Sequence, residues 1–318
     1  LREPLTLIKY INQQITDSKE YYVLIDEVQH LQRFEDALNT LLKNSQLDVY
    51  VTGSNARFLA KDVVTTFRGR GDEVRVHPLS FAEYLSVQQP LPFAEQHLNE
   101  YMRLGGLPQL VVMNSEQQKR QYLSQLFANT YLVDIKERYA IRNDADLEEL
   151  IDVIASSIGS LTNPTKIANS FASVKQSQLS KDTIKRYLDY MQDAFMIEKA
   201  VRYDIKGRKY IDTPAKYYFE DLGLRNARIN FRQTEPTHLM ENLIYNELRV
   251  KGYSIDVGQV VANTRNANGV SERKQLEVDF VCNKADERIY IQSAYAMPTL
   301  EKQEQELKSL KLINDSFQ

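Results

Sequence analysis

The sequence predicts an α/β protein made of several domains, and three observations lead to this fold class. Its 318 residues are enough for two or three domains of ordinary size. An apolar run over residues 21–25 and a second strand pattern over 48–52 flank a helical pattern, which is typical of a βαβ unit with parallel strands. Residues 95–160 are predicted to be mostly helical, and helix and strand patterns alternate from 166 to 312.

The composition narrows the class of protein. There are 40 Lys and Arg against 43 Asp and Glu, a formal net charge of −3, which excludes a generally basic nucleic-acid coat but allows a local basic patch. The single Cys282 excludes an internal disulfide and a Cys-based zinc site, so we expect a reducing compartment, the cytoplasm. No run approaches 18 apolar residues, so we expect no membrane partner.

Apolar spacing predicts the N-terminal elements. We expect a helix over 5–15, a strand buried on both faces over 21–25, a helix over 31–42 and a second strand over 48–52. The alternation at 73–77 predicts a short strand that Pro78 stops, after which Ser80 caps a helix.

The later elements suggest two further modules. Helices over 166–173 and from Ser180, followed by two strands around the basic turn Lys206–Lys209, are typical of a winged helix. Beyond these we expect a helix over 238–250, a strand over 253–257, a polar loop over 263–275, strands over 277–281 and 289–294, and a helix over 300–312.

Two acids, Asp26 and Glu27, follow the first apolar strand directly. A strand of a parallel sheet holds such carboxylates at the carboxyl edge, where ligands bind in α/β proteins. The first acid is placed to hold Mg²⁺ and the second to orient and deprotonate an attacking water. The alternative is a strand that simply ends in polar loop residues.

Small polar residues also follow the second strand. Ser54 and Asn55 could sense a γ-phosphate or position water, or they could cap a helix after a turn. Farther on, Arg70 lies in the segment Arg68–Arg70 and could stabilise transferred phosphoryl charge, or it could be a solvated surface arginine.

Short motifs along the whole chain resemble a large prokaryotic family, the AAA-type ATPases that carry a C-terminal domain of unknown function and are related to the archaeal-type ATPases. The motifs occur in the expected order: Tyr21–His30, Val49–Asn55, Phe67–Arg70 with Pro78–Phe81, Leu104–Pro108, Tyr217–Leu224 and Glu277–Val281. The resemblance implies that Asp26 is the Walker B magnesium acid, Glu27 the catalytic glutamate and Asn55, with Ser54 beside it, the sensor. It gives Arg70 a phosphate-facing role.

The sequence departs from this family at one point. No G-x-x-x-x-G-K-[ST] loop occurs in the 318 residues, although that loop supplies most of the phosphate affinity through its backbone N–H groups and its lysine. We therefore expect a chain truncated before the Walker B strand and near its C-terminus. ATP and Mg²⁺ are the cofactors that the family implies, and this chain is expected to bind ATP poorly.

Four domains follow from these patterns and the resemblance: an incomplete AAA-type ATPase core over 1–90, a helical lid or connector over 91–160, a winged-helix-like domain over 161–230, and an incomplete restriction-endonuclease-like domain over 231–318. The function predicted is a nucleotide-driven switch. The alternative is a DNA- or protein-binding module, a winged helix plus an inactive nuclease-like domain, with a structural ATPase remnant.

Two further groups of residues bear on that alternative. Cations of the winged-helix segment could meet nucleic-acid phosphates, although interleaved acids weaken their field: Lys181, Lys185, Arg186, Lys206, Arg208 and Lys209. Four C-terminal residues resemble a restriction-endonuclease-like metal site: Glu241, Glu277, Asp279 and Gln292. Ala294 stands where that site needs its lysine, so we expect a degenerate, non-catalytic cluster.

Overall fold

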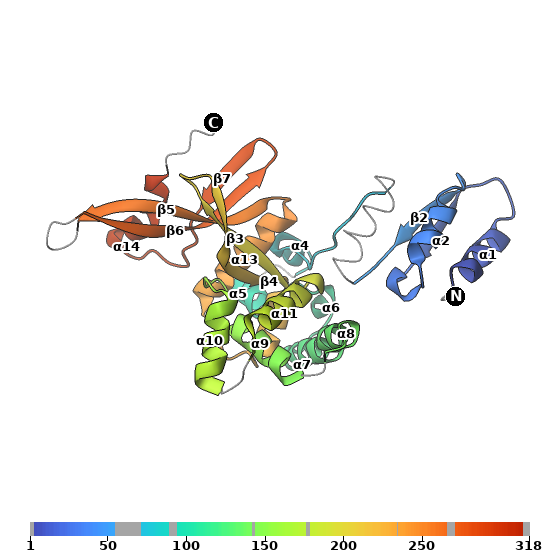
Figure 1. The fold of residues 1–318 in the computed structure, drawn as a ribbon, viewed down its shortest axis with the longest axis horizontal. Coiled ribbons are helices and arrows are strands. Elements are labelled where there is room, and N and C mark those ends of the chain that lie inside the picture. The colour runs from blue at the N-terminus through green and yellow to red at the C-terminus, as the bar shows by residue number, and fades with distance from the viewer. Residues whose placement is uncertain are drawn as a thin grey trace. The chain divides into compact units, whose positions relative to one another are not determined.

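The computed structural model describes residues 3–54, 71–88, 94–141, 144–175, 179–233, 235–265 and 271–313 (Figure 1). The chain divides into two compact units. Unit 1 comprises residues 1–76 and 192–195, and unit 2 comprises the rest of 77–318. Among the described residues, every helix is too short or too polar to cross a membrane.

Unit 1 is built on two parallel strands. Its elements are α1 (Pro4–Gln14), β1 (Tyr21–Ile25), the 3₁₀ turn η1 (Val28–His30), α2 (Phe34–Leu41) and β2 (Leu47–Val51). The register pairs Tyr21 with Leu47 and Ile25 with Val51, which confirms the predicted parallel pair. Because the chain crosses from β1 to β2 through α2, the carboxyl ends of both strands lie at one edge.

Only one face of this strand pair is covered within the described part of unit 1. Val23 and Ile25 pack on the apolar cluster that α1 and α2 form. On the other face Leu24 is 78% exposed, and Tyr22 and Tyr50 are also exposed. The prediction of a strand buried on both faces is therefore wrong for the residues that the structure describes.

The segment that follows shows one wrong and one confirmed prediction. Residues 73–77 form no strand, and Val74 and Val76 are almost fully exposed, since no neighbouring strand pairs with them in the described residues. Ser80 does cap the helix α4 (Phe81–Ser86). Its hydroxyl accepts from the Glu83 N–H, and the Glu83 carboxylate accepts from the Ser80 N–H, a reciprocal capping box.

The helical part of unit 2 packs around one short central helix, α12 (Leu222–Arg228), which is buried along almost its whole length. Helices α5, α7 and α9 contact it. The predicted helical region contains α5 (Ala94–Leu104), α6 (Pro108–Val111), α7 (Glu116–Leu126), the π-helical turn η3 (Phe127–Leu132), α8 (Val133–Arg138) and α9 (Asp144–Ser156).

The sheet of unit 2 has five strands in the order β4-β3-β5-β6-β7. After α10 (Pro164–Lys175) and α11 (Lys181–Asp193) come β3 (Ile197–Asp204) and β4 (Lys209–Phe219), then α13 (Pro236–Val250), β5 (Ser254–Arg265), β6 (Ser271–Lys284), β7 (Glu287–Ile291), α14 (Leu300–Leu307) and the turn η4 (Leu310–Leu312). Strand β3 is antiparallel to β4 and parallel to β5. The strands predicted for two separate domains therefore belong to one sheet.

Strands β5 and β6 form a long antiparallel ribbon that extends past the other strands of the sheet (Figure 1). The polar loop predicted over 263–275 is wrong at both ends, because β5 continues through Arg265 and β6 begins at Ser271. Polar residues occupy these positions because the ribbon is exposed there: Asn263, Arg273 and Lys274 all face solvent.

Candidate functional site

A polar rim of four residues, Asp26, Glu27, Thr52 and Ser54, follows the carboxyl ends of β1 and β2 in unit 1. The Thr52 hydroxyl joins the two acids. Its Oγ1 accepts from the Glu27 N–H at 3.0 Å and donates to Oδ1 of Asp26. The rim is fixed to the strands because the Thr52 N–H donates to the Ile25 carbonyl at 2.9 Å.

Glu27 is held by its own hydrogen bonds. Its Oε2 accepts from Oγ of Ser54 at 3.1 Å and from Nε2 of Gln29. Its backbone is left-handed, with φ of 49°. A non-glycine residue keeps this costly conformation only where surrounding contacts hold it. The Val28 N–H supports this turn by donating to the Thr52 carbonyl at 3.0 Å.

The rim offers oxygen ligands to a cation. Asp26 is exposed and Glu27 is half-buried, so one carboxylate faces solvent and the other is anchored. In the described residues, no three His, Cys, Asp or Glu side chains are grouped to hold a metal ion. A cation at Asp26 would therefore complete its oxygen shell with water and with a ligand such as a phosphate chain.

The sequence prediction for this site is only partly described by the structure. Asp26, Glu27 and Ser54 lie together, whereas Asn55 and Arg70 are outside the described residues. Thr52 and Gln29 were not predicted. Both lie inside the quoted motifs, and the available signal for Thr52 was a hydroxyl residue at the carboxyl end of the second predicted strand.

A second cluster lies in unit 2 and centres on Lys216 of β4. Its Nζ lies 2.8 Å from Oε1 of Glu241 on α13, 2.6 Å from Oε1 of Glu277 and 3.4 Å from Oδ1 of Asp279, both on β6. The Tyr218 hydroxyl donates to the same Oε1 of Glu241 at 2.6 Å.

Gln292 lies next to this cluster. Its Oε1 accepts from the Asp279 N–H at 3.4 Å, and the Ser293 N–H donates to Oδ2 of Asp279 at 2.8 Å. The structure thus brings the three predicted acids and the predicted amide together. Lys216 was not predicted, although a lysine in the buried run Ala215–Phe219 is itself a signal, because a buried ammonium needs partners.

Burial and the neighbouring charges change the pKa values of Asp279 and Lys216 in this cluster. Burial raises the pKa of Asp279 to about 6, against the opposing attraction of Lys216. Burial by itself would lower the pKa of Lys216, but the charges of Glu241, Glu277 and Asp279 outweigh it and raise that pKa above its usual value. The lysine is therefore a fixed cation at neutral pH.

The predicted nucleic-acid contacts all lie on exposed parts of unit 2. Three are on α11, two are in the turn between β3 and β4, and one is the first residue of β4: Lys181, Lys185, Arg186, Lys206, Arg208 and Lys209. Lys199 of β3 and Asp212 of β4 form an ion pair. Lys185 acts on the same Asp212, whose pKa Lys199 and Lys185 lower.

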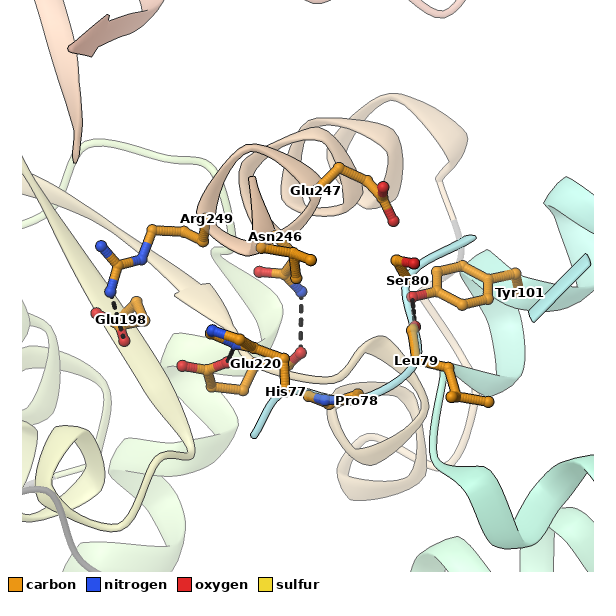
Figure 2. Close-up of a pocket in the computed structure, with 11 residues that line it drawn as sticks. His77, Pro78, Leu79, Ser80, Tyr101, Glu198, Glu220, Asn246, Glu247 and Arg249 are labelled. Atoms are coloured by element: carbon orange, nitrogen blue, oxygen red, sulfur yellow. Dashed lines mark hydrogen bonds and ion pairs between the residues drawn. The ribbon is translucent and has the colours of Figure 1, made fainter. Parts of the chain in front are cut away.

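The segment that leads into unit 2 is docked beside α13 (Figure 2). The Phe81 N–H donates to Oε1 of Glu247 at 2.7 Å, and the Tyr101 hydroxyl donates to the Leu79 carbonyl at 2.5 Å. Nδ1 of His77 lies 3.6 Å from Oε2 of Glu220. These contacts fix the start of unit 2 to both α5 and α13.

Two of the quoted motifs, Leu104–Pro108 and Tyr217–Leu224, meet at Asp221. Its carboxylate accepts from the Gly106 N–H at 2.8 Å and from the Leu224 N–H at 2.9 Å. Burial raises the pKa of Asp221 to about 6, although these N–H donors act in the opposite direction. The contact holds α12 against the end of α5, so these motifs serve packing within unit 2.

Comparisons with known proteins match two stretches of the chain to family models. A family model described as "AAA domain" matches residues 1–85, and one described as "Domain of unknown function (DUF8612)" matches residues 95–235. An uncharacterized protein of Haemophilus influenzae is 35% identical over 292 residues, which are 91% of this chain and 69% of that protein. An uncharacterized protein of Methanocaldococcus jannaschii is 26% identical over 308 residues, 92% of this chain and 66% of that protein.

Proposed function

The chain belongs to the AAA-type ATPase-like family that carries a C-terminal domain of unknown function, and from this premise we propose that its polar rim binds Mg²⁺·ATP. Asp26 would hold the Mg²⁺, which would neutralise developing charge on the phosphates. Glu27 would orient and deprotonate the attacking water. Ser54 would contact the terminal phosphate.

The observation that carries this proposal is the arrangement of hydrogen bonds at the rim. Thr52 donates to Asp26 and accepts from the Glu27 backbone, so both acids keep a fixed position at the carboxyl edge of parallel strands. Ligands of α/β proteins bind at such edges. Glu27 keeps Oε1 available for water, since the hydrogen bonds described for it go to Oε2.

We further propose that the hydrolysis cycle acts as a switch. Residues 71–76 of unit 1 continue directly into the docked segment at the start of unit 2. That segment is bonded to Glu247 of α13, and the same helix carries Glu241 of the Lys216 cluster. A displacement of residues 71–76 during the cycle would therefore be transmitted to the sheet of unit 2 through α13.

The magnesium acid can be tested by thermal stability. In a form of the protein that carries a phosphate-binding loop, Mg²⁺·ATP is expected to raise the melting temperature of unit 1. Asp26→Asn is expected to abolish the Mg²⁺-dependent part of this shift, since the exposed Asp26 carboxylate is the proposed cation ligand. Differential scanning calorimetry measures the shift in melting temperature. It is run on the 318-residue chain and, where the coding sequence continues upstream of Leu1, on the extended protein.

A matched control for this test lies at the opposite end of β1. Glu20 is exposed and precedes the strand, so Glu20→Gln removes a similar charge away from the rim and is expected to leave the shift unchanged. No Mg²⁺·ATP shift in any form that carries a phosphate-binding loop would overturn the proposal.

A second candidate function is binding of nucleic acid by α11 and the β3–β4 turn. It is favoured by six exposed cations on α11, in this turn and at the first residue of β4. Binding to a DNA duplex is expected to weaken with salt, and Lys185→Ala with Arg186→Ala should reduce the logarithmic salt slope by about 2, because each phosphate contact contributes about 0.9. Fluorescence anisotropy across a salt series measures the slope, and an unchanged slope would contradict this function.

A further inference from the structure

Lys216 is an unusual residue for its position in the fold. It lies in the part of β4 that is buried, and its side chain is only 3% exposed. An ammonium in such a place is strongly destabilising unless carboxylates compensate it and its protons are hydrogen-bonded. The structure supplies three carboxylates for this one charge.

These carboxylates come from two different elements and converge on a single point. Glu241 reaches the Nζ atom of Lys216 from α13, and Glu277 and Asp279 reach it from alternate positions of β6. Oxygen atoms from several carboxylates around one centre are also how a protein holds Mg²⁺ or Mn²⁺, at about 2.0–2.2 Å. Here the centre is already taken by the nitrogen, 2.6–3.4 Å from the three oxygens.

The restriction-endonuclease-like resemblance of this cluster implies a divalent metal, and the residues present do not fit one. A metal at the centre would overlap the Lys216 ammonium, and the two cations would repel each other. In the part of the chain that the structure describes, no group of three or more His, Cys, Asp or Glu side chains, this cluster included, is arranged to hold a metal ion. Ala294 also leaves the expected lysine position without a cation.

We propose that Lys216 is a built-in cation that replaces the divalent metal of this cluster, tying β4, α13 and β6 together without metal. The remaining polar contacts agree with this role. The Tyr218 hydroxyl donates to Glu241 and the Ser293 N–H donates to Asp279, so two carboxylates have a second donor. Glu277, the third, is 35% exposed and is partly solvated.

The proposal predicts a metal site that opens only when the lysine is removed. In Lys216→Met the carboxylates lose their cation, and the melting temperature of unit 2 should fall by about 6 °C or more. Mn²⁺ should restore at least half of this loss, and adding Asp279→Asn to Lys216→Met should abolish the rescue. In protein that keeps Lys216, the effect of Mn²⁺ on the melting temperature should be the same with and without Asp279→Asn.

Differential scanning calorimetry of the full chain with and without Mn²⁺ measures these shifts, and Lys308→Met is the matched control because Lys308 is exposed at the end of α14. If Lys216→Met does not fold, the same comparison is made on Lys216→Met with Glu241→Gln, which removes one uncompensated charge. Failure of Mn²⁺ to stabilise the lysine variant would overturn the proposal. The proposal would also be overturned if the wild type bound Mn²⁺ through Asp279 or cleaved DNA in the presence of Mn²⁺.

Discussion

Replacing Gly223 with alanine is expected to destabilise unit 2 by about 3 kcal/mol or more, the upper range for forcing an extra carbon into packed structure. A Cβ at this position would lie 1.9 Å from the carbonyl oxygen of Leu104 and 2.5 Å from its carbon. These are backbone atoms at the end of α5, so no side-chain rotation can relieve the overlap. Gly223 is the second residue of α12, and the absence of a Cβ allows the helix to approach the end of α5 this closely.

Equilibrium unfolding in urea, followed by circular dichroism, measures this loss. Gly71→Ala is the matched control, because a Cβ at Gly71 would meet nothing within 4 Å and its free energy of unfolding should stay close to that of the wild type. A Gly223→Ala protein within about 1 kcal/mol of wild type would show that α5 and α12 separate readily.

Glu27→Gln is expected to lower the rate of ATP hydrolysis by about 10²- to 10⁴-fold, the usual contribution of a general base. The amide is nearly isosteric and can still bond Ser54, so Mg²⁺·ATP should bind about as tightly as before. The effect should therefore fall on kcat and not on Kd, since only the proton transfer from water is lost.

The assay applies to whichever form of the protein shows the Mg²⁺·ATP shift. Glu35→Gln on α2 is its control, because it makes the same chemical change on a helix outside the rim. Equal hydrolysis by Glu27→Gln and the wild type would contradict the catalytic role while leaving Mg²⁺ binding by Asp26 intact. Asp26→Asn thus tests binding of Mg²⁺·ATP, and Glu27→Gln tests its hydrolysis.

The sequence predicted the local features of the rim well, because these depend on neighbouring residues. Apolar runs identified β1 and β2, and the acids that follow β1 identified the edge where Asp26 and Glu27 lie. The bond from Thr52 to Asp26 spans 26 positions and depends on strand register, which spacing alone does not give. The roles of Asn55 and Arg70 stay predictions.

The sequence was a poorer guide to pairing over long distances. The alternation at 73–77 resembles a strand, but a strand also needs a partner, and none pairs with it in the described residues. Lys216 was missed for a related reason. Its partners on α13 and β6 lie 25 to 63 positions away, so only the folded sheet brings them together.

Strand β3 is hydrogen-bonded to β4 on one side and to β5 on the other. It therefore forms the seam between two segments that look like independent modules in the sequence. Dividing the chain at residue 230 would leave a strand edge with unpaired backbone N–H and C=O groups on each fragment, and such edges promote aggregation. We therefore expect the segment up to β4 and the segment from α13 to β7 to fold as one unit.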